Sequence, residues 1–227
     1  NTTAQRVLID HHLHPPVDGY TVQFSDTHSC STSYIVYQLI EALAGTDAID
    51  QAMAEALYVG IMTDTGNFSF SNLTSDLFRT VAVLIDRGVN VPYVNSSVYD
   101  NFSEGRMRLL GYMLNDKMVT DYRYGVAYVS LTEEEMRRFN FIQGDSEGFV
   151  NYPLSIRGIR MSAMFIQTKH SIRVSLRSRG SDVDVNVFAR RYFDGGGHRN
   201  AAGGKSYVSM DETLKNFHTY LKEYFGA

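Results

Sequence analysis

The sequence contains no tryptophan, only one cysteine and only four prolines among its 227 residues. The single cysteine, Cys30, excludes an intramolecular disulfide framework, so we expect a reducing, cytoplasmic compartment. No apolar run approaches the roughly 20 residues that span a bilayer, and we therefore expect no membrane partner. Hydrophobic residues make up 44% of the chain, which is enough for a sizeable core in one domain or two.

Basic residues are also scarce, but only in the first part of the chain. Residues 1–100 carry three lysines and arginines against eleven aspartates and glutamates, whereas residues 151–205 carry ten against three. An acidic segment suits cations, and a basic segment suits phosphates or nucleic acid. A solvated charge imbalance without function is the alternative interpretation.

The first hundred residues alternate short strands with amphipathic helices. A buried strand is expected over residues 6–9, directly before the polar residues Asp10, His11 and His12. Capping residues and glycine stops then predict three helices, over residues 32–44, 50–61 and 75–87. This alternation is typical of an open α/β sheet, whose ligands bind outside the carboxyl ends of its strands.

A different pattern begins after Pro92. A connecting helix is expected over 103–116, and it leads to a hairpin over 117–130. Two strands, a short helix and a closing helix are expected over residues 159–166, 172–177, 185–192 and 211–224. The second of these strands alternates apolar residues with Arg173, Ser175 and Arg177, so one face carries positive charge. We therefore predict two domains, residues 1–102 and 117–227, joined by a linker helix over 103–116.

The triplet Asp10, His11 and His12 lies where a strand is expected to end. Neutral imidazole ligates Mn²⁺ and similar ions, and a neighbouring carboxylate can orient the ring through its other N–H. In the segment TDTGNF, Asp64 could supply a hard oxygen ligand at the start of a loop. Simple polar turns would explain both segments without any metal.

The segment GGGHRNAAGG, residues 195–204, follows the basic strand. Three successive glycines remove the Cβ atoms that would keep an anion from the backbone amides, and His198 and Arg199 add donors beside them. The segment could therefore form an anion-binding nest. A merely flexible loop is the alternative.

Together, DHH at 10–12, GIMTDTGNF at 60–68, SLRSRG at 175–180 and GGGHRNAAGG at 195–204 resemble the DHH phosphoesterase superfamily. Their order and spacing are similar to those of the branch of bifunctional oligoribonucleases and pAp phosphatases, also called nanoRNases, over essentially the whole chain. This resemblance implies an α/β fold, with an open, mainly parallel sheet in the DHH domain and a smaller α/β DHH-associated domain that binds substrate.

The resemblance implies roles for ten residues. His11 and Asp64 would be metal ligands, and Asp10 would support the metal shell. His12 would approach the substrate phosphate, which completes a catalytic group of four residues. Substrate would be bound by Arg177, Gly195, Gly196, Gly197, His198 and Asn200. Two Mn²⁺ ions, with Mg²⁺ or Co²⁺ as substitutes, would lower the pKa of a bridging water that attacks phosphorus.

The sequence also departs from the family pattern. The opening metal motif of the family, a His followed by Asp-x-Asp, has no counterpart among the nine residues before Asp10. We therefore expect this chain to be the C-terminal part of a longer protein, and to be inactive by itself. Asp194 stands where a further glycine is usual, which places a carboxylate beside the expected nest. Arg199 stands where lysine is usual and keeps the charge.

The function implied is that of a phosphoric ester hydrolase of the 3'–5' oligoribonuclease and nucleotide phosphatase type. Its partners would be short single-stranded oligoribonucleotides and small nucleotides such as pAp, and a homodimer is compatible with the sequence. Two alternatives stay open. One is hydrolysis of inorganic pyrophosphate or polyphosphate by the same centre, and the other is a non-catalytic nucleotide-binding module that keeps the fold.

Overall fold

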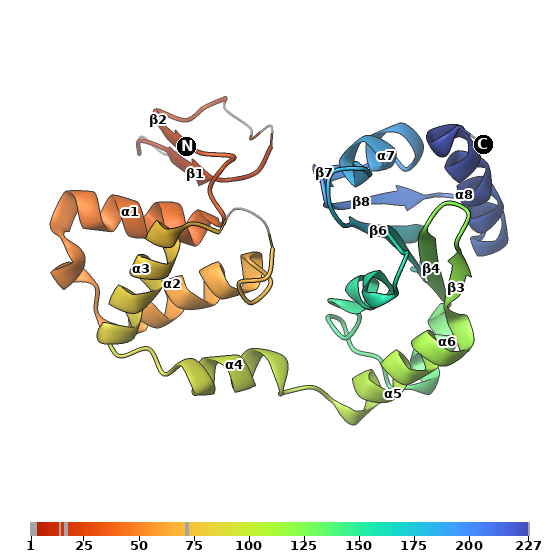
Figure 1. Ribbon diagram of the computed structural model, residues 1–227, viewed down its shortest axis with the longest axis horizontal. Helices are drawn as coiled ribbons and strands as arrows, with labels where there is room; N and C mark the ends of the chain where they lie inside the picture. The colour runs from red at the N-terminus through yellow and green to blue at the C-terminus, as the bar shows by residue number, and fades with distance from the viewer. Residues whose placement is uncertain (1–3, 14, 16–17, 71–72, 227) are drawn as a thin grey trace. The chain divides into compact units, whose positions relative to one another are not determined.

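The computed structural model describes residues 4–13, 15, 18–70 and 73–226, and the chain forms two compact units (Figure 1). Unit 1 comprises Asn1–Asn101 and unit 2 comprises Phe102–Ala227. Both combine helices with a sheet, which confirms the expected α/β class. Unit 2 is the longer of the two in this chain.

Unit 1 begins with two short parallel strands and continues with helices. Strand β1, Val7–Asp10, pairs in parallel with β2, Val22–Ser25, so that Asp10 lies beside Ser25 at the carboxyl end. The helices are α1 Thr32–Ala44, a 3₁₀ turn Thr46–Ala48, α2 Gln51–Asp64, α3 Ser75–Asp86 and α4 Val91–Tyr99. The parallel pairing agrees with the sheet type predicted for this part of the chain.

Side-chain caps fix where these helices begin. The Ser31 hydroxyl accepts from the amide of Tyr34 at α1, and the Thr74 hydroxyl accepts from the amide of Leu77 at α3. Helix α4 was not expected, because Pro92 suggested a break in the pattern. Pro92 instead lies in the first turn of α4, where a missing N–H costs nothing.

Helix α2 lies at the centre of unit 1. Its residues Ala54, Ile61 and Met62 are fully buried in the unit's main hydrophobic cluster. At Gly60 the helix approaches α1 so closely that a Cβ atom would lie 1.9 Å from the Ser33 hydroxyl oxygen. The glycine therefore sets how near the two helices come, and α2 carries Asp64 at its end.

Unit 2 is built on a six-stranded sheet with the strand order β3-β4-β5-β6-β8-β7. Neighbouring strands are antiparallel except for the parallel pair β4 and β5. The strands are β3 Val119–Asp121, β4 Val126–Leu131, β5 Met161–Gln167, β6 Ile172–Ser178, β7 Gly196–His198 and β8 Ala201–Ser206. The expected hairpin and the two expected strands are all present.

Helices cover the two faces of this sheet unequally. One face packs against α7, Val185–Tyr192, and α8, Met210–Phe225. The opposite face is covered at β4 and β5 by α5 Glu104–Tyr112, the π-helical turn Met113–Lys117, α6 Glu133–Arg138 and the 3₁₀ segment Phe149–Ser155. The helix expected over 103–116 thus packs its apolar residues into the core of unit 2.

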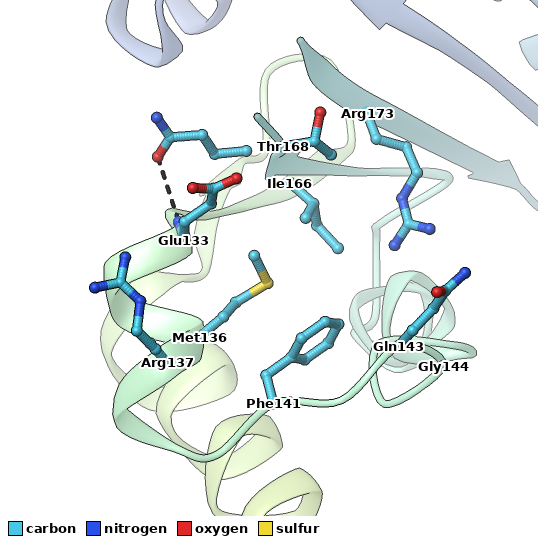
Figure 2. Close-up of a pocket in the computed structure, with 10 residues that line it drawn as sticks. Glu133, Met136, Arg137, Phe141, Gln143, Gly144, Ile166, Thr168 and Arg173 are labelled. Carbon is cyan, nitrogen blue, oxygen red and sulfur yellow. Dashed lines mark hydrogen bonds between the residues drawn. The ribbon is translucent and has the colours of Figure 1, made fainter. Parts of the chain in front are cut away.

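Strand β6 has the alternation expected of it. Ile172, Val174 and Leu176 are buried in the cluster under α7 and α8, whereas Arg173 is exposed and Arg177 is half-buried on the other face. A pocket of about 440 Å³ opens on that other face, between α6 and the adjacent ends of β5 and β6 (Figure 2). Among the described residues, no helix combines the length and apolar character needed to cross a membrane.

Candidate functional site

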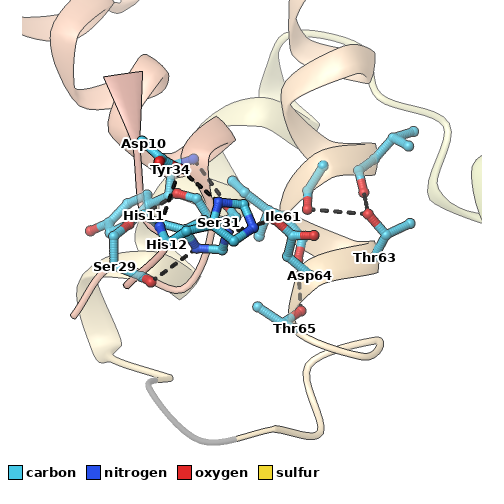
Figure 3. Close-up of polar contacts among 12 residues, drawn as sticks. Asp10, His11, His12, Ser29, Ser31, Tyr34, Ile61, Thr63, Asp64 and Thr65 are labelled. Carbon is cyan, nitrogen blue, oxygen red and sulfur yellow. Dashed lines mark hydrogen bonds and ion pairs between the residues drawn. The ribbon is translucent and has the colours of Figure 1, made fainter. Parts of the chain in front are cut away.

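The DHH triplet lies at the carboxyl end of β1, and α2 brings Asp64 to it (Figure 3). His11 Nε2 lies 3.7 Å from Asp64 Oδ2. The Asp64 side chain is 44% exposed and that of His11 only 12%, so this pair meets solvent mainly through the carboxylate. Two ligand atoms that share one divalent ion lie about 3 to 4 Å apart at ordinary coordination angles. The donor types and their separation therefore fit a shared metal ion.

Asp64 was expected at the start of a loop, but it is the last residue of α2. The buried side chain of Thr65 explains the extra turn, because its hydroxyl donates to the Ile61 carbonyl at 2.7 Å and accepts from the Phe68 amide at 3.1 Å. The chain then turns through Gly66, Asn67 and Phe68, all with φ between 55° and 58°. Left-handed backbone at a phenylalanine is uncommon and is held only by surrounding structure.

The ring of His11 is oriented by the backbone. Its Nδ1 lies 3.4 Å from the carbonyl oxygen of Ser29, which can only accept. The contact favours the tautomer with the proton on Nδ1, which leaves the Nε2 lone pair directed at Asp64. Sequence reasoning missed Ser29, since a main-chain contact leaves no signature in the residue type.

Asp10 contacts His12 in this structure. Its Oδ1 lies 2.6 Å from His12 Nδ1 and accepts from the His12 amide at 3.1 Å. Burial opposes ionisation of Asp10, but these hydrogen bonds outweigh it and hold the pKa of the carboxyl below its ordinary value. Asp10 therefore stays a carboxylate that orients the His12 ring, and the rings of His11 and His12 meet edge-on at 4.6 Å.

In unit 2, Arg177 lies half-buried on the uncovered face of β6. Its Nη1 donates to the carbonyl of Leu176 at 2.9 Å, and burial lowers the pKa of the guanidinium, against a weaker opposing effect of Glu147. Within the part of the chain that the structure describes, no carboxylate forms an ion pair with it. A partly desolvated guanidinium of this kind is suited to an anionic ligand.

The glycine run is neither a flexible loop nor an open nest. It forms β7, which pairs with β8 as a hairpin. The Gly195 amide donates to the Ala189 carbonyl at 3.3 Å, and the Gly197 amide donates to Asn186 Oδ1 at 3.1 Å. A Cβ on Gly195 would lie 2.0 Å from the Gly203 carbonyl oxygen. These glycines permit close backbone packing, and two of their amides are used inside the unit.

The polar residues after the run are also engaged locally. Asn200 Nδ2 donates to Ser178 Oγ and to the Gly180 carbonyl, each at 2.9 Å. Arg199 Nη2 donates to the Ser181 carbonyl at 2.6 Å, so this arginine ties down a loop. Asp194 has φ 46°, a conformation that glycine adopts most easily, which explains why glycine would suit this position.

The predicted site residues thus fall into two groups. Unit 1 brings together the four catalytic candidates Asp10, His11, His12 and Asp64. Unit 2 contains the six substrate-binding candidates, on β6, on β7 and in the adjoining turns. The first group has donor atoms that fit a cation, and the second combines a partly desolvated guanidinium with a hairpin rich in glycine.

Comparison with known proteins shows what the chain is similar to. Residues 121–227 match the model of the DHHA1 domain. Over 97% of its length the chain is 29% identical to the bifunctional oligoribonuclease and PAP phosphatase NrnA of Bacillus subtilis. It is also 29% identical, over 88% of its length, to a probable enzyme of the same name from Streptococcus mutans.

A solved structure supports the fold independently. An exopolyphosphatase-related protein from Bacteroides fragilis is 38% identical and matches 98% of this chain with a TM-score of 0.92. The chain spans 69% and 62% of the two curated relatives and 64% of the solved chain. The fold is therefore shared with these proteins over nearly all of the sequence given.

Proposed function

We propose that the protein bearing this sequence is a metal-dependent phosphoesterase that hydrolyses short oligoribonucleotides to mononucleotides and pAp to AMP. The observation that carries the proposal is the approach of His11 Nε2 to Asp64 Oδ2 at 3.7 Å. The names of the curated relatives, oligoribonuclease and PAP phosphatase, support the choice of substrate. The lone, half-buried cysteine supports the cytoplasm as its compartment, and a homodimer stays a prediction.

The metal proposed is Mn²⁺, with His11 and Asp64 among its ligands. Imidazole nitrogen and carboxylate oxygen are both ordinary donors to this ion. When bound, a divalent ion at such a site lowers the pKa of a coordinated water and neutralises phosphoryl oxygens. The carbonyl of Ser29 would keep Nε2 of His11 available as a donor, and Asp10 would support the site indirectly by holding His12.

We assign His12 to the substrate phosphate. The contact of the Asp10 carboxylate with Nδ1 fixes the ring, and Nε2, on the other side of the ring, would face a phosphoryl oxygen. The His12 side chain is 61% exposed, which leaves it accessible to a ligand. Its role would be to bind and orient the phosphate.

Unit 1 would be the C-terminal part of the DHH domain, and unit 2 the substrate-binding domain. Arg177 is the anion-binding residue best supported, because it is partly desolvated and forms no ion pair with a carboxylate among the described residues. His198 would add a donor, and Asn200 retains its Oδ1 as an acceptor because its amide hydrogens are already used. The glycines 195–197 would contribute by keeping the hairpin thin, since two of their amides are occupied.

Polyphosphate is the second candidate substrate, because the related Bacteroides fragilis protein is described as exopolyphosphatase-related. A polyphosphate site needs cations alone, whereas a nucleotide site also needs a surface for the base. Hydrolysis of pAp, a trinucleotide and tripolyphosphate by the natural protein, measured side by side, discriminates the two. Preference for tripolyphosphate would contradict our assignment.

Two substitutions test the residue assignment in the same protein. Asp64→Asn should lower kcat for pAp by on the order of 100-fold or more and weaken Mn²⁺ binding measured by electron paramagnetic resonance. His198→Ala should lower kcat/KM by about 100-fold without changing Mn²⁺ binding. Arg157→Ala, an exposed residue in neither group, serves as the control. Unchanged pAp hydrolysis in Asp64→Asn would sink the proposal.

A further inference from the structure

The pocket beside α6 has an apolar floor and lies outside the residues assigned so far (Figure 2). Met136 and Ile166 are buried at its base, and the half-buried ring of Phe141 points into it. Its volume of about 440 Å³ falls in the range of about 300–1,000 Å³ typical of small-molecule sites. An aromatic ring beside an aliphatic floor is suited to a flat, apolar group such as a nucleobase.

Two arginines line this pocket, Arg137 and Arg173, against a single carboxylate, Glu133. Arg173 Nη2 donates to the hydroxyl of Ser146 at 2.9 Å, which leaves its charge uncompensated. Throughout the described ranges, neither arginine takes part in an ion pair. The pocket therefore combines an apolar floor with a net positive rim, which favours an anion that carries an apolar ring.

Strand β6 connects the pocket to Arg177. Arg173 and Arg177 lie on the same face, four residues apart, so their Cα atoms are about 13 Å apart at about 3.3 Å per residue. Between them, Ser175 pairs with Gly203 of β8 on one side and with the buried Met164 of β5 on the other, so the strip has no bulky side chain on its β8 side. Successive phosphates of an oligonucleotide could follow this strip from one arginine to the other.

The end of the strip carries two like charges. Arg173 pairs directly with Lys205 of β8, and both side chains are exposed. Like charges directly opposite each other on a sheet are destabilising. A bound phosphate would remove this repulsion, so the pair points to an anionic ligand at the end of the strip nearest the pocket.

We infer that this pocket binds a nucleotide of an oligoribonucleotide distal to the one held at Arg177, with the base against Phe141 and the phosphate at Arg173 and Lys205. The inference rests on the proposed function and extends it. The pocket would contribute to the affinity for oligonucleotides and not for pAp. It would thus set how strongly the protein prefers a trinucleotide to a mononucleotide.

The test is isothermal titration calorimetry of this chain with pAp and with a triadenylate, in chelator so that no hydrolysis occurs. Arg173→Ala should weaken triadenylate binding about 10-fold and pAp binding less than twofold, whereas Arg177→Ala should weaken both. Arg157→Ala, in the exposed turn that precedes β5, is the matched control and should change neither. The slope of log Kd against log salt for triadenylate should fall by about 0.7 in Arg173→Ala, because the loss of one phosphate contact on a single strand changes the slope by this amount.

A second measurement tests whether the distal base stacks on Phe141. A trinucleotide with 2-aminopurine at its distal end should lose fluorescence on binding through stacking on Phe141. Phe141→Leu, which keeps the site apolar, should abolish this quenching and weaken binding severalfold. Tripolyphosphate should bind equally well to Phe141→Leu and to the unsubstituted chain.

Several results would overturn the inference. Equal weakening of pAp and triadenylate by Arg173→Ala would show that the pocket is no distal subsite, and unchanged binding of both would show that it takes no part. The proposed function would survive either result if the natural protein hydrolyses pAp. It fails separately if pAp is neither bound nor hydrolysed.

Discussion

Glu135 shows how a single carboxylate can be held ionised by its surroundings. Burial by itself would raise its pKa, but three donors act in the other direction: Lys117 Nζ at 2.6 Å, the Thr132 amide at 2.8 Å and the Tyr112 hydroxyl at 2.8 Å. They lower the pKa of Glu135 to about 2. The network joins α6 to the turn after α5, far along the chain from the predicted catalytic residues.

This depressed pKa predicts a specific loss of stability in acid. A carboxyl whose pKa is lower in the folded state stabilises the fold above its unfolded pKa, near 4.5, and the stabilisation is lost as the pH falls towards about 2. We expect Glu135 to account for about 2 kcal/mol of the stability lost between pH 6 and pH 3. Urea unfolding of Glu135→Gln should show a correspondingly flatter pH dependence.

Glu134→Gln, on the exposed side of the same helix, is the control for this experiment and should follow the unsubstituted chain. Parallel curves for Glu135→Gln and the unsubstituted chain would show that the network does not stabilise the folded state. The residues concerned could not be found from the sequence alone. The capping box Thr132 to Glu135 is a local signal, but its contacts with Lys117 and Tyr112 exist only after folding.

Among the elements, the β7–β8 hairpin contains glycines in two different surroundings, one with no room for a Cβ atom and one with room for it. A Cβ on Gly195 would lie 2.0 Å from a carbonyl oxygen, whereas a Cβ on Gly196 would meet nothing closer than 3.5 Å. Gly195→Ala should therefore lower the free energy of unfolding of unit 2 by about 1–3 kcal/mol. Gly196→Ala should change this free energy by less than about 0.5 kcal/mol. Urea unfolding followed by circular dichroism measures both.

If both variants kept their stability but lost affinity for pAp, the glycines would act on the ligand and not on the backbone packing. The hairpin also shows a limit of sequence reasoning. Three glycines predict a backbone that is free of Cβ clashes, and this is observed. The freedom allows close contact with β8 and α7 and does not form an anion-binding nest. The partners of Gly195 and Gly197 are set by how the hairpin packs against α7, which residue types do not specify.

Helix boundaries were predictable where a cap and an apolar face agreed. Ser31 and Gly45 bound α1 as expected, and Thr74 begins α3. The end of α2 was not predictable, because TDTG is typical of a turn, whereas the Thr65 amide and its buried hydroxyl both bond to the Ile61 carbonyl and extend the helix to Asp64. Helix α4 was missed because Pro92 was interpreted as a break.

At the scale of the whole molecule, each hydrophobic cluster lies within one unit. The clusters of unit 2 contain most of the buried side chains, and unit 1 has a smaller cluster around α2. Unit 1 also exposes Val7, Val22 and Phe24 on its two strands. The fold class followed from periodicity, and the likeness to DHH phosphoesterases followed from motif order, whereas the geometry of the predicted metal ligands required coordinates.

This division predicts that residues 102–227 fold without the rest of the chain. The fragment should unfold cooperatively in urea, with the same near-ultraviolet circular dichroism that its tyrosines give in the full chain. Its backbone amides in β4, β5 and β6 should resist hydrogen exchange as they do in the full chain. A gradual, non-cooperative transition would mean that unit 2 depends on unit 1 for its structure.

The contact between His11 and the Ser29 carbonyl also limits what mutagenesis can reveal about this protein. Every residue type supplies the same carbonyl, so position 29 can change without loss of the contact, and an alanine scan would leave it intact. Only a displacement of the backbone at this position would remove it. The residue type at position 29 therefore does not reveal the contact that orients His11, which would be visible only in the path of the chain.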